Sequence, residues 1–260
     1  MPDPKIAFIG GSGLYDMEGM EDCEEITFDT PFGEPSDAIV VGEIDGVKAA
    51  FLPRHGRGHR LSPSEIPVKA NIFALKSLGV ERVVSVSAVG SLKEHIKPLE
   101  LVIPDQIIDR TRHRPDTFFG DGIVAHVGFA DPFCDELRRI ALDAAKNENA
   151  ASHDGGTYVV MEGPQFSTRA ESAVYRSWGA SVIGMTALPE AKLAREAELC
   201  YVTLAFVTDY DVWHDTEEEV TVEMVIKNLV HNIATAQGII KQMLPSIPEN
   251  RTCGCHSALE

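Results

Sequence analysis

Apolar runs and amphipathic segments alternate along nearly the whole chain. The apolar runs are rich in β-branched residues, which is typical of strands buried on both faces of a sheet. Asp45-Gly46 separates two of them and favours a tight hairpin, and Pro104 in another predicts an edge strand or a bulge. We expect strands at residues 5–11, 38–44, 47–52, 82–91, 101–109, 157–163, 181–185 and 200–207.

The amphipathic segments repeat their apolar residues at helical spacing. One of them carries terminal signals as well, with Pro67 at its start and Gly79 at its end. The unbroken alternation predicts an α/β fold, a single domain over residues 1–243 with a mixed twisted β-sheet flanked by helices. Residues 244–260 are expected to form a C-terminal tail. We expect helices at residues 67–79, 131–146, 167–179, 189–198 and 221–243.

Composition and charge exclude several classes of partner. At 260 residues, with 44% hydrophobic and 24% charged residues, the chain suits a globular protein with a substantial core. Its formal net charge of −17 repels polyanions, so we expect no nucleic-acid partner and no membrane partner. A small anion can still bind, because charges more than about 10 Å away are largely screened.

The compartment follows from the start of the chain and from its cysteines. The opening MPDPKIAFIGG lacks the basic segment and apolar stretch of a signal peptide, and no window is apolar for the length of a membrane span. The five cysteines are too few and too scattered for a secreted disulfide scaffold. We therefore expect a cytoplasmic enzyme.

Residues 9–16, IGGSGLYD, form a glycine-rich turn after the first predicted strand. A dinucleotide-binding fingerprint needs a third glycine where this chain has Asp16, and a P-loop would end in Gly-Lys-Ser/Thr. The pattern therefore argues against a dehydrogenase or a P-loop NTPase. The turn either holds one phosphate through its amides and the Ser12 hydroxyl or is a plain tight turn.

Two further strand ends offer groups that bind phosphate. In residues 53–59, PRHGRGH, Arg54 and His55 follow a strand, and a guanidinium matches phosphate oxygens two at a time. His55 and His59 are four apart, but the two glycines between them disfavour the helix that would aim both at one metal. We therefore expect no metal. Ser87, in SAVGS, follows another buried strand, so three loops could converge on one oxyanion.

Asp209 and Asp211 follow the last apolar run, in VTDYDVW. The carboxyl ends of strands are where open α/β sheets bind ligands. Aspartate also suits a turn or a helix N-cap, so these two residues alone leave both interpretations open.

Taken together, the motifs resemble the trimeric purine nucleoside phosphorylase family, and within it the 5′-methylthioadenosine phosphorylases. The resemblance implies phosphorolysis of S-methyl-5′-thioadenosine to adenine and 5-methylthioribose 1-phosphate, with inorganic phosphate as co-substrate and no cofactor. It also implies a homotrimer or a hexamer of two trimers. It is carried, in order over residues 6–243, by FIGGSGLYD, DTPFGEPSDA, PRHGRGH, ANIFALKSLG, SAVGSL, IPDQIIDRT, DPFC, MEGPQFSTRAES, WGA, MTALPEA and TDYDVW.

The resemblance implies a role for each matching residue. Met185 would pack against the ribose, and Phe166 would stack on the purine. Asp209 and Asp211 would face the N7 and N6 edge of adenine, and His126 would reach the 5′ substituent from a neighbouring subunit. The phosphate site would comprise Ser12, Arg54, His55, Ser87, the amide of Ala88, and Thr186, and the alkylthio pocket Val222, Val225 and Ile226.

The chemistry gives the two aspartates a purpose. Breaking the bond between N9 and C1′ leaves electron density on the base and oxocarbenium character on the sugar. A carboxylic acid can protonate N7 if burial and a second carboxylate raise its pKa toward neutrality. We expect Asp209 to be this acid and Asp211 to accept a hydrogen bond from the exocyclic amine. Phosphate arrives already ionised, so no activated side-chain nucleophile is needed.

Several alternatives stay open at this level. Asp209 favours a 6-aminopurine, but a 6-oxopurine nucleoside such as methylthioinosine or inosine is the alternative substrate. The apolar stripe of residues 222–226 is often plain core packing, and as a pocket it would disfavour adenosine only about a hundredfold. A nucleosidase would use water in place of phosphate, and a noncatalytic nucleoside-binding module would bind without turnover. Gly184, before Met185, is expected to leave room around the ribose and base.

The C-terminal Cys253-Gly254-Cys255 resembles tails of archaeal relatives, in which such pairs are linked to thiol–disulfide chemistry. A ring closed across one residue would be strained and easily reduced, which suits a redox role. The alternative is a frayed tail with two free thiols. Cys134 and Cys200 could also pair if the organism is thermophilic.

Overall fold

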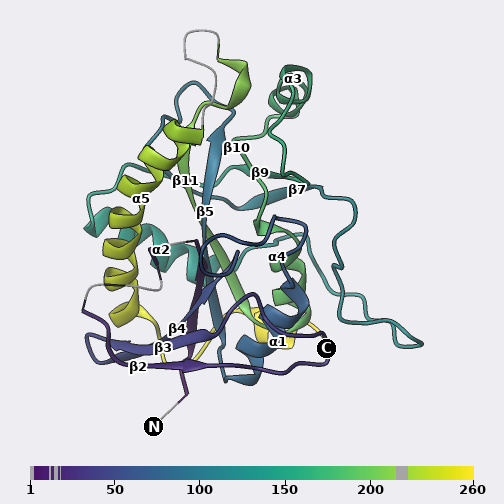
Figure 1. The fold of residues 1–260 in the computed structure, drawn as a ribbon, viewed down its shortest axis with the longest axis vertical. Coiled ribbons are helices and arrows are strands. Elements are labelled where there is room, and N and C mark those ends of the chain that lie inside the picture. The colour runs from purple at the N-terminus through teal and green to yellow at the C-terminus, as the bar shows by residue number, and fades with distance from the viewer. Residues whose placement is uncertain (1–2, 12, 15–16, 18, 215–221) are drawn as a thin grey trace.

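The structure, a computed structural model, describes residues 3–11, 13–14, 17, 19–214 and 222–260, with the backbone alone at residues 222–227 and 229. Four parallel strands form the centre of its mixed sheet (Figure 1). Because they run in the same direction, their carboxyl ends lie at the same edge of the sheet. These strands are β1 (Ile6–Gly10), β4 (Val47–Pro53), β5 (Arg82–Ser91) and β11 (Cys200–Asp209).

Shorter strands extend this centre on both sides. On the side of β4, β3 (Ile39–Ile44) and β2 (Glu21–Ile26) add as antiparallel neighbours. The C-terminal end of β5 pairs with β10 (Val182–Gly184), which is followed in the sheet by β9 (Thr157–Met161) and β7 (Gln106–Arg110). A second branch runs from β11 to β6 (Leu101–Ile103) and then to β8 (Ser152–Asp154).

Helices cover both faces of the sheet (Figure 1). Helices α1 (Val68–Ser77) and α4 (Ala187–Glu196) contribute to one apolar core, and α2 (Asp135–Asn147) and α5 (Val222–Met243) to the other. Alternate side chains of β11 enter the two cores, which is why every residue of that strand is buried. Helix α3 (Arg169–Ser177) lies beyond these two layers, and its Tyr175 packs in a smaller third cluster with Val159 of β9 and Ile183 of β10. Within the described part of the chain, none of the helices has the length and apolarity to cross a bilayer.

The predicted single α/β domain with a mixed sheet is confirmed, and most predicted elements are present within one to three residues of their expected bounds. The prediction of one strand at 101–109 is wrong, because this segment forms two strands with different partners. β6 pairs with β11 and β8, and β7 pairs with β9. Pro104 lies at the break and cannot donate to a ladder. The edge strand β2 was not predicted, because its side chains are polar and almost all exposed.

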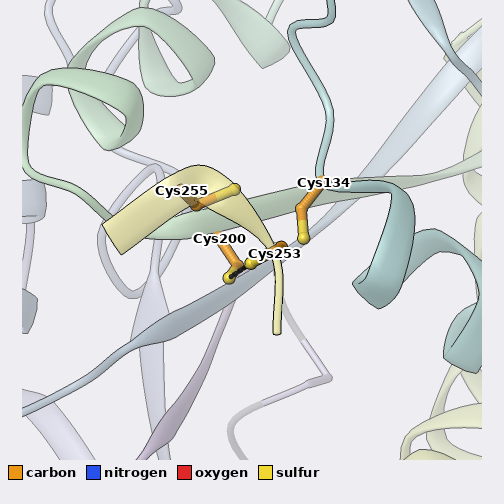
Figure 2. A group of neighbouring side chains, drawn as sticks. All are labelled: Cys134, Cys200, Cys253 and Cys255. Atoms are coloured by element: carbon orange, nitrogen blue, oxygen red, sulfur yellow. Dashed lines mark hydrogen bonds between the residues drawn. The ribbon is translucent and has the colours of Figure 1, made fainter. Parts of the chain in front are cut away.

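The tail beyond α5 packs onto the domain. It forms two short 3₁₀ turns, η2 (Leu244–Ser246) and η3 (Gly254–Ser257), and Leu244 and Cys255 are buried in the core that α2 and α5 share. This packing argues against a frayed tail. The five cysteines are free thiols, so neither expected disulfide is shown; instead Cys134, Cys200, Cys253 and Cys255 come together (Figure 2).

A buried ion pair joins the ends of the central strands. Arg54, directly after β4, is 2% exposed, and its Nε lies 2.5 Å from Oε1 of Glu190 in α4. The same guanidinium donates to the carbonyl oxygens of Ile9 and Val86 and to the Ser85 hydroxyl. It therefore fixes β1, β4, β5 and α4 against one another at the sheet edge where the loops begin.

We expect Glu190→Gln to destabilise the protein by about 3–5 kcal/mol, because it leaves the Arg54 charge buried without its counter-ion. Urea unfolding at a fixed protein concentration measures the change. The control is Glu34→Gln, at an exposed loop position, which should shift the free energy of unfolding by less than about 0.5 kcal/mol. Equal stability of the two variants would contradict the proposed role of the pair.

Candidate active site

A cavity of about 390 Å³ opens at the carboxyl ends of the central strands. Its walls come from segments far apart in the sequence, including the loop after β4, the end of β5, the β10–α4 junction and the end of β11. Nine residues predicted from the sequence line it: Arg54, His55, Ser87, Ala88, Phe166, Met185, Thr186, Asp209 and Asp211.

A β-bulge at Thr208 places Asp209 in this cavity. Val207 pairs with Val89 and Asp209 with Gly90, so two residues of β11 stand opposite one residue of β5. Such a bulge changes the direction in which the following side chain points. A Cβ on Gly90 would lie 3.0 Å from Oδ1 of Asp209, so the missing side chain gives the carboxylate its space.

The two aspartates form one hydrogen-bonded unit. Asp209 accepts from the Thr208 hydroxyl at 2.7 Å and from the Asp211 amide at 2.8 Å. Asp211 has a left-handed backbone with φ of 54°, and its Oδ2 has no hydrogen-bond partner among the described residues. Both oxygens of Asp209 are thus hydrogen-bonded, whereas Asp211 keeps a buried carboxyl oxygen that can still accept a hydrogen bond.

Both carboxyls are harder to ionise than an ordinary aspartate. Burial is the largest cause, raising the pKa of Asp209 and raising the pKa of Asp211 to about 6. Hydrogen bonding partly opposes the pKa shift of both residues, and for Asp211 the neighbouring charge of Asp209 adds to the rise. Near neutral pH the pair can therefore hold a proton that a substrate nitrogen could take.

Hydroxyl groups lie together in another part of the wall. Ser87 Oγ on β5 is 2.9 Å from Thr186 Oγ1, the residue before α4, and the Thr186 hydroxyl does not cap its helix. Two adjacent hydroxyls can donate to one oxyanion. The Arg54 guanidinium lines the same cavity, but it is largely engaged by Glu190 and by strand carbonyls. Nη1 donates only to the Val86 carbonyl oxygen and so keeps one N–H for a ligand, while Glu190 balances the positive charge. The predicted contact of Arg54 with phosphate stays a prediction.

His55 lines the cavity as a neutral ring. Burial first, and then the charge of Arg54, lower the pKa of His55 to about 4. Its Nδ1 lies 2.8 Å from the Leu61 carbonyl oxygen, which can only accept, so Nδ1 carries the proton. The remaining Nε2 can accept a hydrogen bond from a protonated phosphate oxygen. His59 stacks on this ring with 4.1 Å between centroids, an arrangement of packed faces in which the two imidazoles do not converge on a metal.

The remaining lining is apolar. Phe166 is 51% exposed at the rim, and Met185 follows β10. The expectation that Gly184 leaves room is wrong, because a Cβ there would lie 2.2 Å from the buried Tyr158 hydroxyl of β9. Position 184 requires glycine because the Tyr158 side chain occupies the space that a larger residue would need.

Some predicted site residues are not brought to this cavity by the described chain. His126 is exposed on the long loop between β7 and α2 and does not line the cavity. Ser12 lies outside the described residues, and so do the side chains of Val222, Val225 and Ile226, whose backbone begins α5. Their assigned roles stay predictions.

Two asparagines of α5 contribute to the site although no role was predicted for them from the sequence. Asn228 and Asn232 donate to the carbonyl oxygens of Thr208 and Val207, which ties the helix to the end of β11. Asn232 also lines the cavity, and its buried Oδ1 has no partner among the described residues. The available signal was their spacing of four residues on an otherwise apolar helix face.

We expect Asp211→Asn to stabilise the protein at alkaline pH. The raised pKa means that the folded state holds its proton more tightly, so Asp211 lowers stability as the pH rises from about 3.8 through about 6. Removing the carboxyl should add about 1–3 kcal/mol to the free energy of unfolding at pH 8 and little at pH 4. Urea titrations at both pH values measure this difference.

The matched control is Asp45→Asn, at an exposed position with a similar backbone, φ of 49°. It should give no pH-dependent gain. If Asp211→Asn shifts stability equally at both pH values, burial of an ionisable group is not the cause.

Comparison with known proteins agrees with this architecture. A phosphorylase from Koribacter versatilis, named S-methyl-5′-thioadenosine phosphorylase, is 58% identical over 98% of this chain and 87% of its own. The protein of that name from Pyrococcus furiosus is 51% identical over 99% of this chain and 98% of its own.

Solved structures agree as well. A methylthioadenosine phosphorylase from an antarctic soil metagenomic library superimposes with a TM-score of 0.95 at 55% identity, over 100% of this chain and 92% of that one. The methylthioadenosine phosphorylase from Schistosoma mansoni in complex with adenine gives 0.90 at 36% identity, over 95% and 93%. The sequence profile of the Phosphorylase superfamily matches residues 5–245, and the chain belongs to that family.

Proposed function

We propose that this protein catalyses the phosphorolysis of S-methyl-5′-thioadenosine to adenine and 5-methylthioribose 1-phosphate. The observation that carries the proposal is the shared cavity, which is lined both by the buried carboxyls of Asp209 and Asp211 and by the hydroxyls of Ser87 and Thr186. The carboxyls suit the purine, and the hydroxyls suit the phosphate. Relatives at 51–58% identity over nearly the whole chain bear the name of this activity.

Phosphate is the nucleophile. The hydroxyls of Ser87 and Thr186 and the Ala88 amide donate to its oxygens, with Ser12 as a further predicted donor. Neutral His55 accepts from its single O–H group. The dianion held under the sugar also stabilises the positive charge that develops at C1′.

Departure of the base needs a proton. As a phosphate oxygen bonds to C1′, the bond from C1′ to N9 breaks and its electron pair goes to the purine. Asp209 gives its proton to N7, and solvent later restores it. Asp211 accepts from the exocyclic amine, Phe166 stacks on the purine at the cavity rim, and Met185 packs on the ribose. A 6-aminopurine matches this pair of acceptor and acid.

Initial rates on S-methyl-5′-thioadenosine, methylthioinosine, adenosine and inosine, each with and without inorganic phosphate, test the reaction. We expect release of adenine from the first substrate to require phosphate, and activity on adenosine to be lower by about a hundredfold. Equal rates without phosphate would indicate a nucleosidase. Preference for the inosines would indicate a 6-oxopurine enzyme.

Asp209→Asn should lower kcat/KM by about 10²–10⁴, because the amide keeps the shape but cannot protonate N7. In the unmodified protein kcat/KM should fall as the pH rises through the raised pKa of the acid. The control is Asp143→Asn on the exposed face of α2, which should leave kcat/KM unchanged. Binding without turnover in the unmodified protein would instead indicate a noncatalytic module.

The same proposal includes a homotrimer or a hexamer of two trimers. His126 is exposed and lies outside its own chain's cavity, and Ile123 and Val124 of the same loop are 66% and 76% exposed, as suits a loop covered by a neighbouring subunit. We expect His126→Ala to raise KM for S-methyl-5′-thioadenosine severalfold without changing the molar mass seen by light scattering. A fully active monomer would contradict this assembly.

A further inference from the structure

Four cysteine side chains meet on the face of the sheet that α2 and α5 cover (Figure 2). Their sulfur atoms all lie within 4.8 Å of one another, and the sulfurs of Cys200 and Cys253 are 3.3 Å apart. Cys134, Cys200 and Cys255 are buried, and Cys253 is half-buried. None of the four lines the catalytic cavity, so the proposed function does not use them.

The backbone around the cluster is held in place by its own hydrogen bonds. Cys134 is the N-cap residue directly before α2, and its amide donates to the Tyr201 carbonyl oxygen of β11 at 2.8 Å. The Thr252 amide and hydroxyl both donate to the Glu136 carboxylate in the first turn of α2. The Cys253-Gly254-Cys255 turn is therefore fixed opposite the strand and helix that supply the other two sulfurs.

A buried positive charge stands beside the cluster. Arg82 on β5 pairs in register with Cys200 on β11, is 1% exposed, and has no hydrogen-bond partner for its three guanidinium nitrogens among the described residues. Glu81 lies 3.7 Å from it, between nitrogen and oxygen, and Glu136 in the first turn of α2 interacts with it electrostatically, but neither carboxylate accepts a hydrogen bond from it. The buried guanidinium can therefore stabilise further negative charge at the cluster.

We propose that Cys134, Cys200, Cys253 and Cys255 bind one zinc ion as a closed, structural Cys₄ site that fastens the C-terminal tail to α2 and β11. Two thiolates on one tetrahedral zinc, each with a bond of about 2.3 Å, lie about 3.8 Å apart, which small side-chain movements reach from the present spacing. Each thiol that becomes a ligand releases its proton. Four thiolates with Zn²⁺ carry a net charge of −2, which Arg82 partly balances.

Ligand chemistry favours this metal. Soft thiolates in a tetrahedral S₄ set select zinc or an iron–sulfur cluster over the hard cations that prefer oxygen ligands. With four protein ligands the site has no open position, so the ion stabilises the fold without taking part in turnover. A pair of disulfides among the same sulfurs is the competing outcome that the experiment must separate.

The test uses the full-length protein purified without chelator and with zinc in the growth medium. Elemental analysis should find about one zinc per chain, and cobalt substitution should give the intense sulfur-to-cobalt charge-transfer absorption of a thiolate-rich tetrahedral site. Cys255→Ser should lower the zinc content at least tenfold, whereas the control Cys23→Ser, at the exposed cysteine outside the cluster, should keep it. Alkylation of the denatured protein followed by mass spectrometry reports whether the thiols are reduced.

Zinc at about one per chain with all five thiols reduced supports the proposal. Metal-free protein with disulfides among the four cysteines overturns it, and so does metal-free protein with reduced thiols after incubation with excess zinc. Iron with sulfide in place of zinc also overturns the assignment. Because zinc content is measured directly, each result is independent of whether the protein turns over S-methyl-5′-thioadenosine.

Discussion

The ion pair between Arg54 and Glu190 is the interaction on which the rest of the site depends. Its guanidinium reaches β1, β5 and α4 from the end of β4, and Glu190 also accepts from the Tyr201 hydroxyl of β11. The four central parallel strands are thus all tied to one buried ion pair. Buried pairs of this kind are costly to desolvate, and fixing the relative positions of several loops is a function that packed apolar residues would perform less specifically.

The fixed strand ends allow small local irregularities to have chemical consequences. The extra residue at Thr208 points Asp209 toward the cavity, and the absence of a side chain on Gly90 leaves space for its carboxylate. Burial then raises the pKa of both aspartates, while the phosphate region relies on hydroxyls, amides and a neutral His55. In the proposed mechanism, the positive charge for the phosphate thus comes mainly from the developing cation of the sugar.

The sequence predicts the sheet and most helices because their apolar periodicity is strong, and it places nine site residues that the fold does bring to one cavity. It fails where tertiary contacts decide. The pairing of Arg54 with Glu190 was not predicted, because the two residues are 136 positions apart. The bulge at Thr208 and the gathering of four cysteines leave no local pattern, since each depends on which strands and turns become neighbours.

The central claim is that phosphate, held at Ser87 and Thr186, attacks C1′ while a buried acid assists the leaving base. The most direct measurement is turnover of S-methyl-5′-thioadenosine in ¹⁸O-labelled water with unlabelled phosphate, followed by mass spectrometry of the sugar product. The account predicts a sugar 1-phosphate that carries no label. A free sugar with ¹⁸O at C1 would show that water is the nucleophile and would contradict it.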